Sequence, residues 1–195
     1  MKRIAIAVIG LALVGCGGDS DEGNGKDKGG GSSGAGADSP DAVFAKAMAA
    51  LNDSDKKAFA SCLTPESQTE IATSLIIGAA MKTAMKEDGK AEFEAILKKH
   101  GLEKPPAEGE AEPAVKKALE GVKDKPQLVA DLGDWMEKFG GEGSNTKSDA
   151  TLKNVKIDGD KATGTVVTKR SDGTDKTEPT EFHRIDGKWY IHLTH

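Results

Sequence analysis

The chain has 195 residues, with 27 basic and 32 acidic side chains and a formal net charge of −5. A net negative charge argues against binding to nucleic acid, which requires clustered positive charge. It also argues against a polybasic patch that binds a membrane surface. Only two cysteines occur, Cys16 and Cys62. The composition therefore excludes a nucleic-acid-binding protein and a domain held by several disulfides.

The N-terminus carries a short apolar run. Lys2 and Arg3 precede the apolar residues 4–14. This run is shorter than the about 20 apolar residues that span a bilayer. A short apolar core behind basic residues is typical of a secretory signal peptide. We therefore predict a signal peptide over residues 1–15.

Residues 13–16, Leu-Val-Gly-Cys, resemble the bacterial lipobox. The resemblance implies cleavage before Cys16 and lipidation of its thiol and new amine. Two or three acyl chains hold a protein stably on a bilayer, whereas one holds it marginally. We expect a lipoprotein of the cell envelope with the bilayer as partner. In enteric bacteria, an Asp directly after the lipidated cysteine resembles an inner-membrane retention signal, and this chain has Gly17 at that position. We therefore favour the outer membrane, with the domain facing the periplasm. The inner membrane and the cell surface remain open as alternatives.

Residues 16–39 are predicted to form a flexible tether. Gly, Ser, Asp, Lys and Glu dominate this segment, which holds too few apolar residues to form a core. A Gly-rich coil of this length spans on the order of 25 Å. We expect the tether to add nothing to the stability of the folded part.

The first half of residues 40–195 has helical patterns. Ser39-Pro40 and Thr64-Pro65 are typical of helix starts. Residues 52–54 are expected to end the first helix and to cap a second. Apolar residues at helical spacing predict helices over 40–51, 65–80, 90–100, 113–122 and 126–139, with a short helix that carries Phe59, Cys62 and Leu63 between the first two. The length of 40–195 can support one sizeable core.

After Asp149 the apolar residues alternate, which predicts strands. Turns are expected at 158–161, at 171–174 and at Asp186-Gly187, the strongest hairpin signal in the chain. The strands flanking the last turn are predicted over 181–185 and 188–193. We therefore predict a single α+β domain with N-terminal helices packed on a C-terminal antiparallel sheet.

The Asp186-Gly187 turn fixes which residues face each other across the last hairpin. It places Phe182 opposite Ile191 and Arg184 opposite Trp189, so that an apolar face is available for the helices. On the other face, His183 lies opposite Tyr190 and Glu181 lies opposite His192. Trp189 is therefore expected to be a core anchor.

Residues 39–63 (SPDAVFAKAMAALNDSDKKAFASCL) and the closing strands (VKIDGDKATGTVV and EFHRIDGKWYIHL) resemble nuclear-transport-factor-2-like (NTF2-like) domains, also described as cystatin-like cones. The resemblance implies helices packed on a strongly curved antiparallel sheet, forming a cone with a pocket. Residues 81–143 depart from a minimal member, because they are longer and more helical. We expect extra helices there, which could fill or cap the pocket.

The same resemblance suggests where catalysis would lie. Enzymes of this superfamily use an Asp or His base aimed into the cone, sometimes with a Tyr donor. The candidates here are His183, Tyr190, Glu181 and His192. The alternative, which we favour, is that these four residues form the solvent face of the terminal hairpin. We therefore assign no catalytic residue.

No cofactor or metal motif is recognised. His192 and His195 are the only histidines close in sequence, whereas zinc sites need three or four ligands. The function expected is a non-catalytic binding or interaction module with an unidentified protein or small-molecule partner. The alternatives are a receptor for a small apolar ligand in the cone and, third, an isomerase- or dehydratase-like enzyme. A filled cone favours the first, a dry cavity the second, and a pocket with an inward Asp or His the third.

Overall fold

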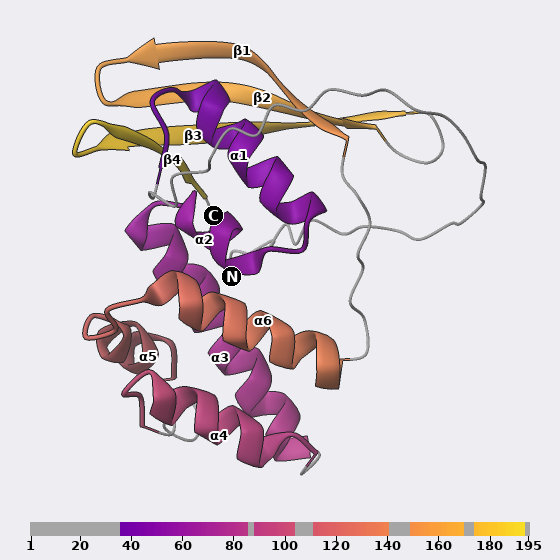
Figure 1. Cartoon of the computed structure of the whole chain (residues 1–195), viewed down its shortest axis with the longest axis vertical. Helices are drawn as coiled ribbons and strands as arrows, with labels where there is room; N and C mark the ends of the chain where they lie inside the picture. Colours follow the sequence, from indigo (N-terminus) through magenta and orange to yellow (C-terminus); the bar gives the residue numbers. More distant parts are fainter. Residues whose placement is uncertain (1–35, 86–87, 104–110, 141–148, 170–173, 194–195) are drawn as a thin grey trace, which may run out of the picture.

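The computed structural model describes residues 36–85, 88–103, 111–140, 149–169 and 174–193. Six helices precede four strands within these ranges (Figure 1). The helices are α1 (Pro40–Asn52), α2 (Lys56–Ser61), α3 (Pro65–Met85), α4 (Lys90–Lys99), α5 (Ala111–Leu119) and α6 (Lys125–Gly140). The strands are β1 (Ala150–Asp158), β2 (Lys161–Lys169), β3 (Asp175–Ile185) and β4 (Lys188–His192). The predicted α+β order is confirmed.

The helix starts follow from side-chain caps. The Ser39 hydroxyl accepts a hydrogen bond from the Ala42 amide at 3.1 Å, and the Thr64 hydroxyl accepts one from the Ser67 amide at 3.2 Å. The prediction for the second helix was wrong by one residue. Its cap is Asp55, whose carboxylate accepts from the Ala58 amide at 2.8 Å.

The four strands form one antiparallel meander in the order β1-β2-β3-β4. Positive φ angles at Asp186 (49°) and Gly187 (77°) are typical of a two-residue type I′ turn between β3 and β4. The predicted register of this hairpin is confirmed, with Phe182 opposite Ile191 and Arg184 opposite Trp189.

Strand β1 departs from the simple alternation that its sequence predicts. Its register with β2 shifts between Lys153 and Lys156, and Asn154 has φ of 55°. This bulge inserts an unpaired residue and turns the strand. Ile157, beyond the bulge, is 60% exposed instead of joining the core.

Two hydrophobic clusters form in the described residues, where the sequence suggested one. The helical cluster joins α3 to α6 around Trp135, Phe93 and Leu128. The sheet cluster joins α1 to the sheet around Val43, Phe182 and Trp189. Ile71 on α3 packs against both clusters. The extra helices therefore have a core of their own.

The helices lie on one side of the sheet, with α1 against it (Figure 1). Side chains from both layers fill the space between them: Val43, Leu63 and Phe182 are fully buried there. Trp189 is 4% exposed, so the predicted core face of the hairpin is confirmed.

The last residues of the predicted tether belong to the folded part. The Ala37 amide donates to the Trp189 carbonyl at 3.1 Å, and the Trp189 amide donates to the Ala37 carbonyl at 2.7 Å. Asp38 forms an ion pair with Lys188 at 2.5 Å. The folded region therefore begins no later than Gly36, whereas the sequence placed its start at residue 40.

Residues 1–35 lie outside the described residues, and with them the predicted signal peptide, Cys16 and most of the tether. Among the helices that are described, none combines the length and the apolar character needed to cross a membrane.

Candidate functional site

Three ligand-type side chains meet on β3 and β4. Glu181, His183 and His192 each offer a carboxylate oxygen or ring nitrogen, and these atoms all lie within 4.8 Å of one another. The Nε2 atom of His183 is 3.9 Å from Oε2 of Glu181. The rings of His183 and His192 stack with their centroids 4.1 Å apart. We call these three residues the cross-strand cluster.

The backbone explains why the cluster forms. Glu181 and His183 are two residues apart on β3, so their side chains emerge on the same face. The type I′ turn at Asp186-Gly187 sets the register that places His192 opposite Glu181. Local sequence therefore positions all three groups.

The end of β4 is held by the start of α3. The Ile191 amide donates to the Cys62 carbonyl and the Thr64 amide donates to the Ile191 carbonyl, both at 2.9 Å. The Leu193 amide donates to the Ser67 hydroxyl at 2.9 Å. These contacts tie the open edge of β4 to the first turn of α3.

The same turn supports His192. Its Nδ1 atom is 3.2 Å from the Thr64 hydroxyl, which is also 2.9 Å from the Ser67 hydroxyl. Each hydroxyl can donate or accept, so this pair accommodates either tautomer of the imidazole. Thr64 therefore orients the ring whichever nitrogen carries the proton.

The environment of His183 disfavours its charged form. Burial is the main cause of its lowered pKa, followed by the charges of His192 and Lys161, while Glu181 and Glu66 act in the opposite direction. Nε2 of His183 is buried and, among the described residues, has no hydrogen-bond partner. A neutral imidazole keeps a lone pair for a ligand.

Tyr190, the fourth candidate, lies opposite His183 in the register. Its ring lies close to the Gly36 backbone: a Cβ built on Gly36 would come within 2.8 Å of the Tyr190 ring carbon that bears the hydroxyl. The described residues show no hydrogen bond between this hydroxyl and the cross-strand cluster. Tyr190 is thus a neighbour of the cluster rather than a member.

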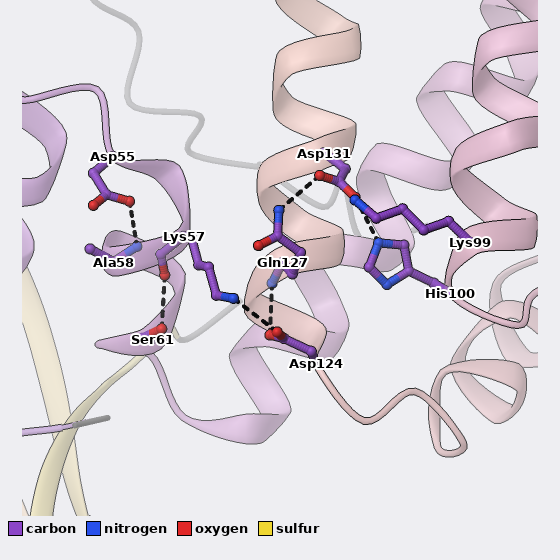
Figure 2. A network of polar contacts seen from close by, with 9 residues as sticks. All are labelled: Asp55, Lys57, Ala58, Ser61, Lys99, His100, Asp124, Gln127 and Asp131. Atoms are coloured by element: carbon purple, nitrogen blue, oxygen red, sulfur yellow. Dashed lines mark hydrogen bonds and ion pairs between the residues drawn. The ribbon is translucent and has the colours of Figure 1, made fainter. Parts of the chain in front are cut away.

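A second polar network lies among the helices (Figure 2). Asp131 on α6 accepts hydrogen bonds from Lys99 at 2.7 Å, from His100 at 2.8 Å and from Gln127 at 2.9 Å. Lys57 on α2 binds Asp124, just before α6, at 2.9 Å. We call this network the helix clasp. It joins α2 and the end of α4 to α6 and has a structural role.

Burial raises the pKa of Asp131, but hydrogen bonds from Lys99, His100 and Gln127 outweigh it and hold the pKa below its ordinary value. The clasp carboxylate is therefore ionised at neutral pH and keeps its three donors.

Cys62 is buried and its thiol donates to the Ala58 carbonyl at 3.3 Å. Burial raises its pKa, although Lys46 acts in the opposite direction. A thiol of this kind is a packing residue rather than a nucleophile.

An open pocket of about 370 Å³ lies elsewhere, on the helical part. Its lining residues are Glu94, Leu97, Lys98, Leu102 and Glu103. None of them belongs to the cross-strand cluster, so this pocket does not supply the cluster with a substrate cavity.

Sequence reasoning brought together Glu181, His183 and His192 but treated them only as acid–base candidates. The two histidines that are close in sequence are His192 and His195, and His195 lies outside the described residues. The sequence does not indicate that Thr64 and Ser67 support this site. Both belong to a helix start, and no local pattern indicates that this helix start packs against β4.

No protein-family model matches the chain, and no curated protein matches it. Among solved structures, the chain is similar to a protein from Campylobacter jejuni provisionally described as an NTF2-like transpeptidase. The identity is 19%, the TM-score is 0.23, and the match covers 40% of this chain and 68% of the other. At this TM-score the likeness carries no inference about fold or function.

Proposed function

We propose that the chain is a membrane-anchored lipoprotein of the bacterial envelope whose α+β domain is a non-catalytic binding or interaction module. The lipobox-like residues 13–16 behind the apolar run support the anchor. The outer membrane facing the periplasm is the proposed location. The partner is a protein or small molecule that the folded domain meets within reach of its tether.

The packing of the sheet supports a non-catalytic role. Val43, Leu63 and Phe182 are fully buried between the sheet and the helices, where an NTF2-like cone would have its pocket. Among the described residues, these side chains occupy the space that a substrate would need beside an inward base. The finer fold assignment, an NTF2-like cone with extra helices, is part of this proposal and rests on residues 39–63 and the closing strands.

Replacing Cys16 tests the anchor. In cells that make the protein, Cys16→Ser should move the chain from the membrane fraction to the soluble fraction, because the thiol that receives lipid is gone. Cys62→Ser is the matched control and should stay with the membrane, since that thiol is buried in the folded domain. A Cys16→Ser chain that sediments with membranes as before contradicts the proposal.

Native mass spectrometry of the full chain separates the binding module from a receptor for a small apolar ligand. A filled sheet layer should retain no apolar compound beyond the lipid on Cys16. A retained apolar compound that survives gentle transfer would favour the receptor.

A further inference from the structure

We propose that Glu181, His183 and His192 bind a divalent transition-metal ion of the zinc type. Two imidazole nitrogens and one carboxylate oxygen are ligands that zinc uses in proteins, with three protein groups and a fourth position open to water. Two imidazole ligands make binding of Mg²⁺ or Ca²⁺ unfavourable, because these ions prefer oxygen ligands. The proposal goes beyond the proposed function and does not depend on the membrane anchor.

The spacing of the ligand atoms is close to what coordination requires. Zinc bonds to nitrogen and oxygen are about 2.0–2.2 Å long, so tetrahedral ligand atoms lie roughly 3.4 Å apart. Nε2 of His183 is already 3.9 Å from Oε2 of Glu181, and the whole set spans at most 4.8 Å. Side-chain rotation alone can close the remaining gap, because the three residues are only partly buried.

His183 offers a nitrogen that lacks another role. Its Nε2 atom is buried and has no hydrogen-bond partner among the described residues, although buried polar atoms in proteins nearly always have one. A bound cation would satisfy this atom.

His192 has the support that metal-binding histidines usually have. Its Nδ1 atom lies 3.2 Å from the Thr64 hydroxyl. If Nδ1 carries the proton and donates it to Thr64, Nε2 is left with the lone pair and becomes the metal ligand. A hydrogen bond of this kind fixes the tautomer and the ring orientation of a ligating histidine.

Two features oppose a cation here. Lys161 pairs with His183 across the sheet, and the N-terminus of α3, close to His192, has a positive dipole end. Glu181 within the cluster and Glu66 in the first turn of α3 provide the opposing negative charge. The stacked rings must also rotate so that their lone pairs converge. These features predict an exchangeable ion rather than a permanent structural one.

Titration of the purified full chain, prepared without a polyhistidine tag, tests the proposal. Calorimetry with Zn²⁺ should give one saturable site, and Co²⁺ should give a visible absorption spectrum with the same stoichiometry. Mg²⁺ should not compete. Glu181→Gln, His183→Gln and His192→Gln should each weaken Zn²⁺ binding by roughly tenfold or more.

Glu178→Gln is the matched control, because Glu178 is on the same strand but its carboxylate pairs with Lys176 at 2.9 Å. It should bind Zn²⁺ like the unmodified chain. Thr64→Val should weaken binding, and Thr64→Ser, which keeps the hydroxyl, should restore it.

NMR of the histidine ring signals in the unmodified chain tests the proposal even if a variant fails to fold. Zn²⁺ should shift the ring signals of His183 and His192 and leave those of His100 in place. Absence of a saturable site, equal binding by the three cluster variants and the unmodified chain, or equal loss in Glu178→Gln would each overturn the proposal. Loss of membrane anchoring in the Cys16→Ser chain would leave these results unchanged, so the two proposals fail separately.

Discussion

Trp189 and Tyr190 are neighbours in β4 with opposite surroundings. Trp189 points into the sheet cluster and is 4% exposed, whereas Tyr190 lies on the other face beside His183. The alternation of side chains along a strand explains the difference. The free energy of unfolding should therefore depend strongly on the first residue and weakly on the second.

Trp189→Ala should unfold the domain or destabilise it by about 3–5 kcal/mol, the usual cost of removing a buried Trp. Tyr190→Phe and His183→Ala should each cost under about 1 kcal/mol, as changes outside the core usually do. Chemical denaturation of the three variants measures this. Tolerance of Trp189→Ala together with a large loss in His183→Ala would mean that the core lies on the opposite face of the hairpin.

At the scale of elements, the free edge of β4 is closed by two segments from elsewhere in the chain. Ala37 pairs with Trp189 and Leu63 pairs with Ile191. An unpaired strand edge would leave backbone groups without partners and invite pairing with other chains. The segment before α1 is therefore part of the sheet rather than part of the tether.

Gly36 makes this contact possible. Its φ is +69°, and a Cβ there would approach the Trp189 carbonyl oxygen within 2.9 Å. Gly101, with φ of +73° and open space around it, is the matched control. Gly101→Ala should cost only the backbone strain of about 1–2 kcal/mol. Gly36→Ala should cost roughly 1–3 kcal/mol more because of the clash. Equal losses in the two variants would contradict the clash, and a Gly36→Ala chain that melts like the unmodified chain would show that residues 36–38 do not contribute to stability.

The helix clasp should contribute to the free energy of unfolding. Asp131 is 16% exposed and accepts from three side chains, so Asp131→Asn should cost roughly 1–3 kcal/mol at pH 7. Asp134→Asn on the same helix is the control. Its carboxylate is 70% exposed with one ion pair, and the cost should stay within about 1 kcal/mol.

The pH dependence of that difference follows from the lowered pKa of Asp131. The group is more acidic in the folded protein than its ordinary 3.8, so its stabilisation is present above pH 3.8 and is lost as pH falls through the folded pKa. Denaturant melts from pH 7 downwards should show the gap between the unmodified chain and Asp131→Asn closing only at acid pH. A gap that is constant over this range would mean that the carboxylate charge does not hold the clasp.

Across the whole molecule, the features that the sequence predicts correctly are those set by residues close together in the chain, such as turns and helix caps. The Asp186-Gly187 turn sets the register of the last hairpin and so brings Glu181, His183 and His192 together. Ser39 and Thr64 mark their helix starts because capping is a local interaction.

Features that depend on packing between distant segments were not predictable. The bulge at Asn154 needs a positive φ that no glycine indicates. The first half of β3 contains polar residues and Pro179, which disfavour a strand. Proline is tolerated there because β4 pairs only with residues 181–185, so β3 is an edge at Pro179. The second core forms where the apolar faces of α3 to α6 pack against one another. Helical periodicity predicts that a helix has an apolar face, but it does not predict which other helix that face contacts.

We propose a folded domain whose lipid anchor, Cys16, lies at the other end of a Gly-rich segment. The domain needs no spanning helix if Cys16 carries lipid, and two or more acyl chains are enough for stable attachment. The proposed lipidation would hold the protein at a membrane and would thereby set which partners are within its reach.

Intact mass spectrometry of the chain extracted from membranes tests that claim most directly. The account predicts that residues 1–15 are absent and that the N-terminal residue is Cys16 carrying a diacylglyceryl group and a further acyl chain. A membrane-extracted chain that retains residues 1–15, or that begins at another residue with Cys16 unmodified, would contradict it.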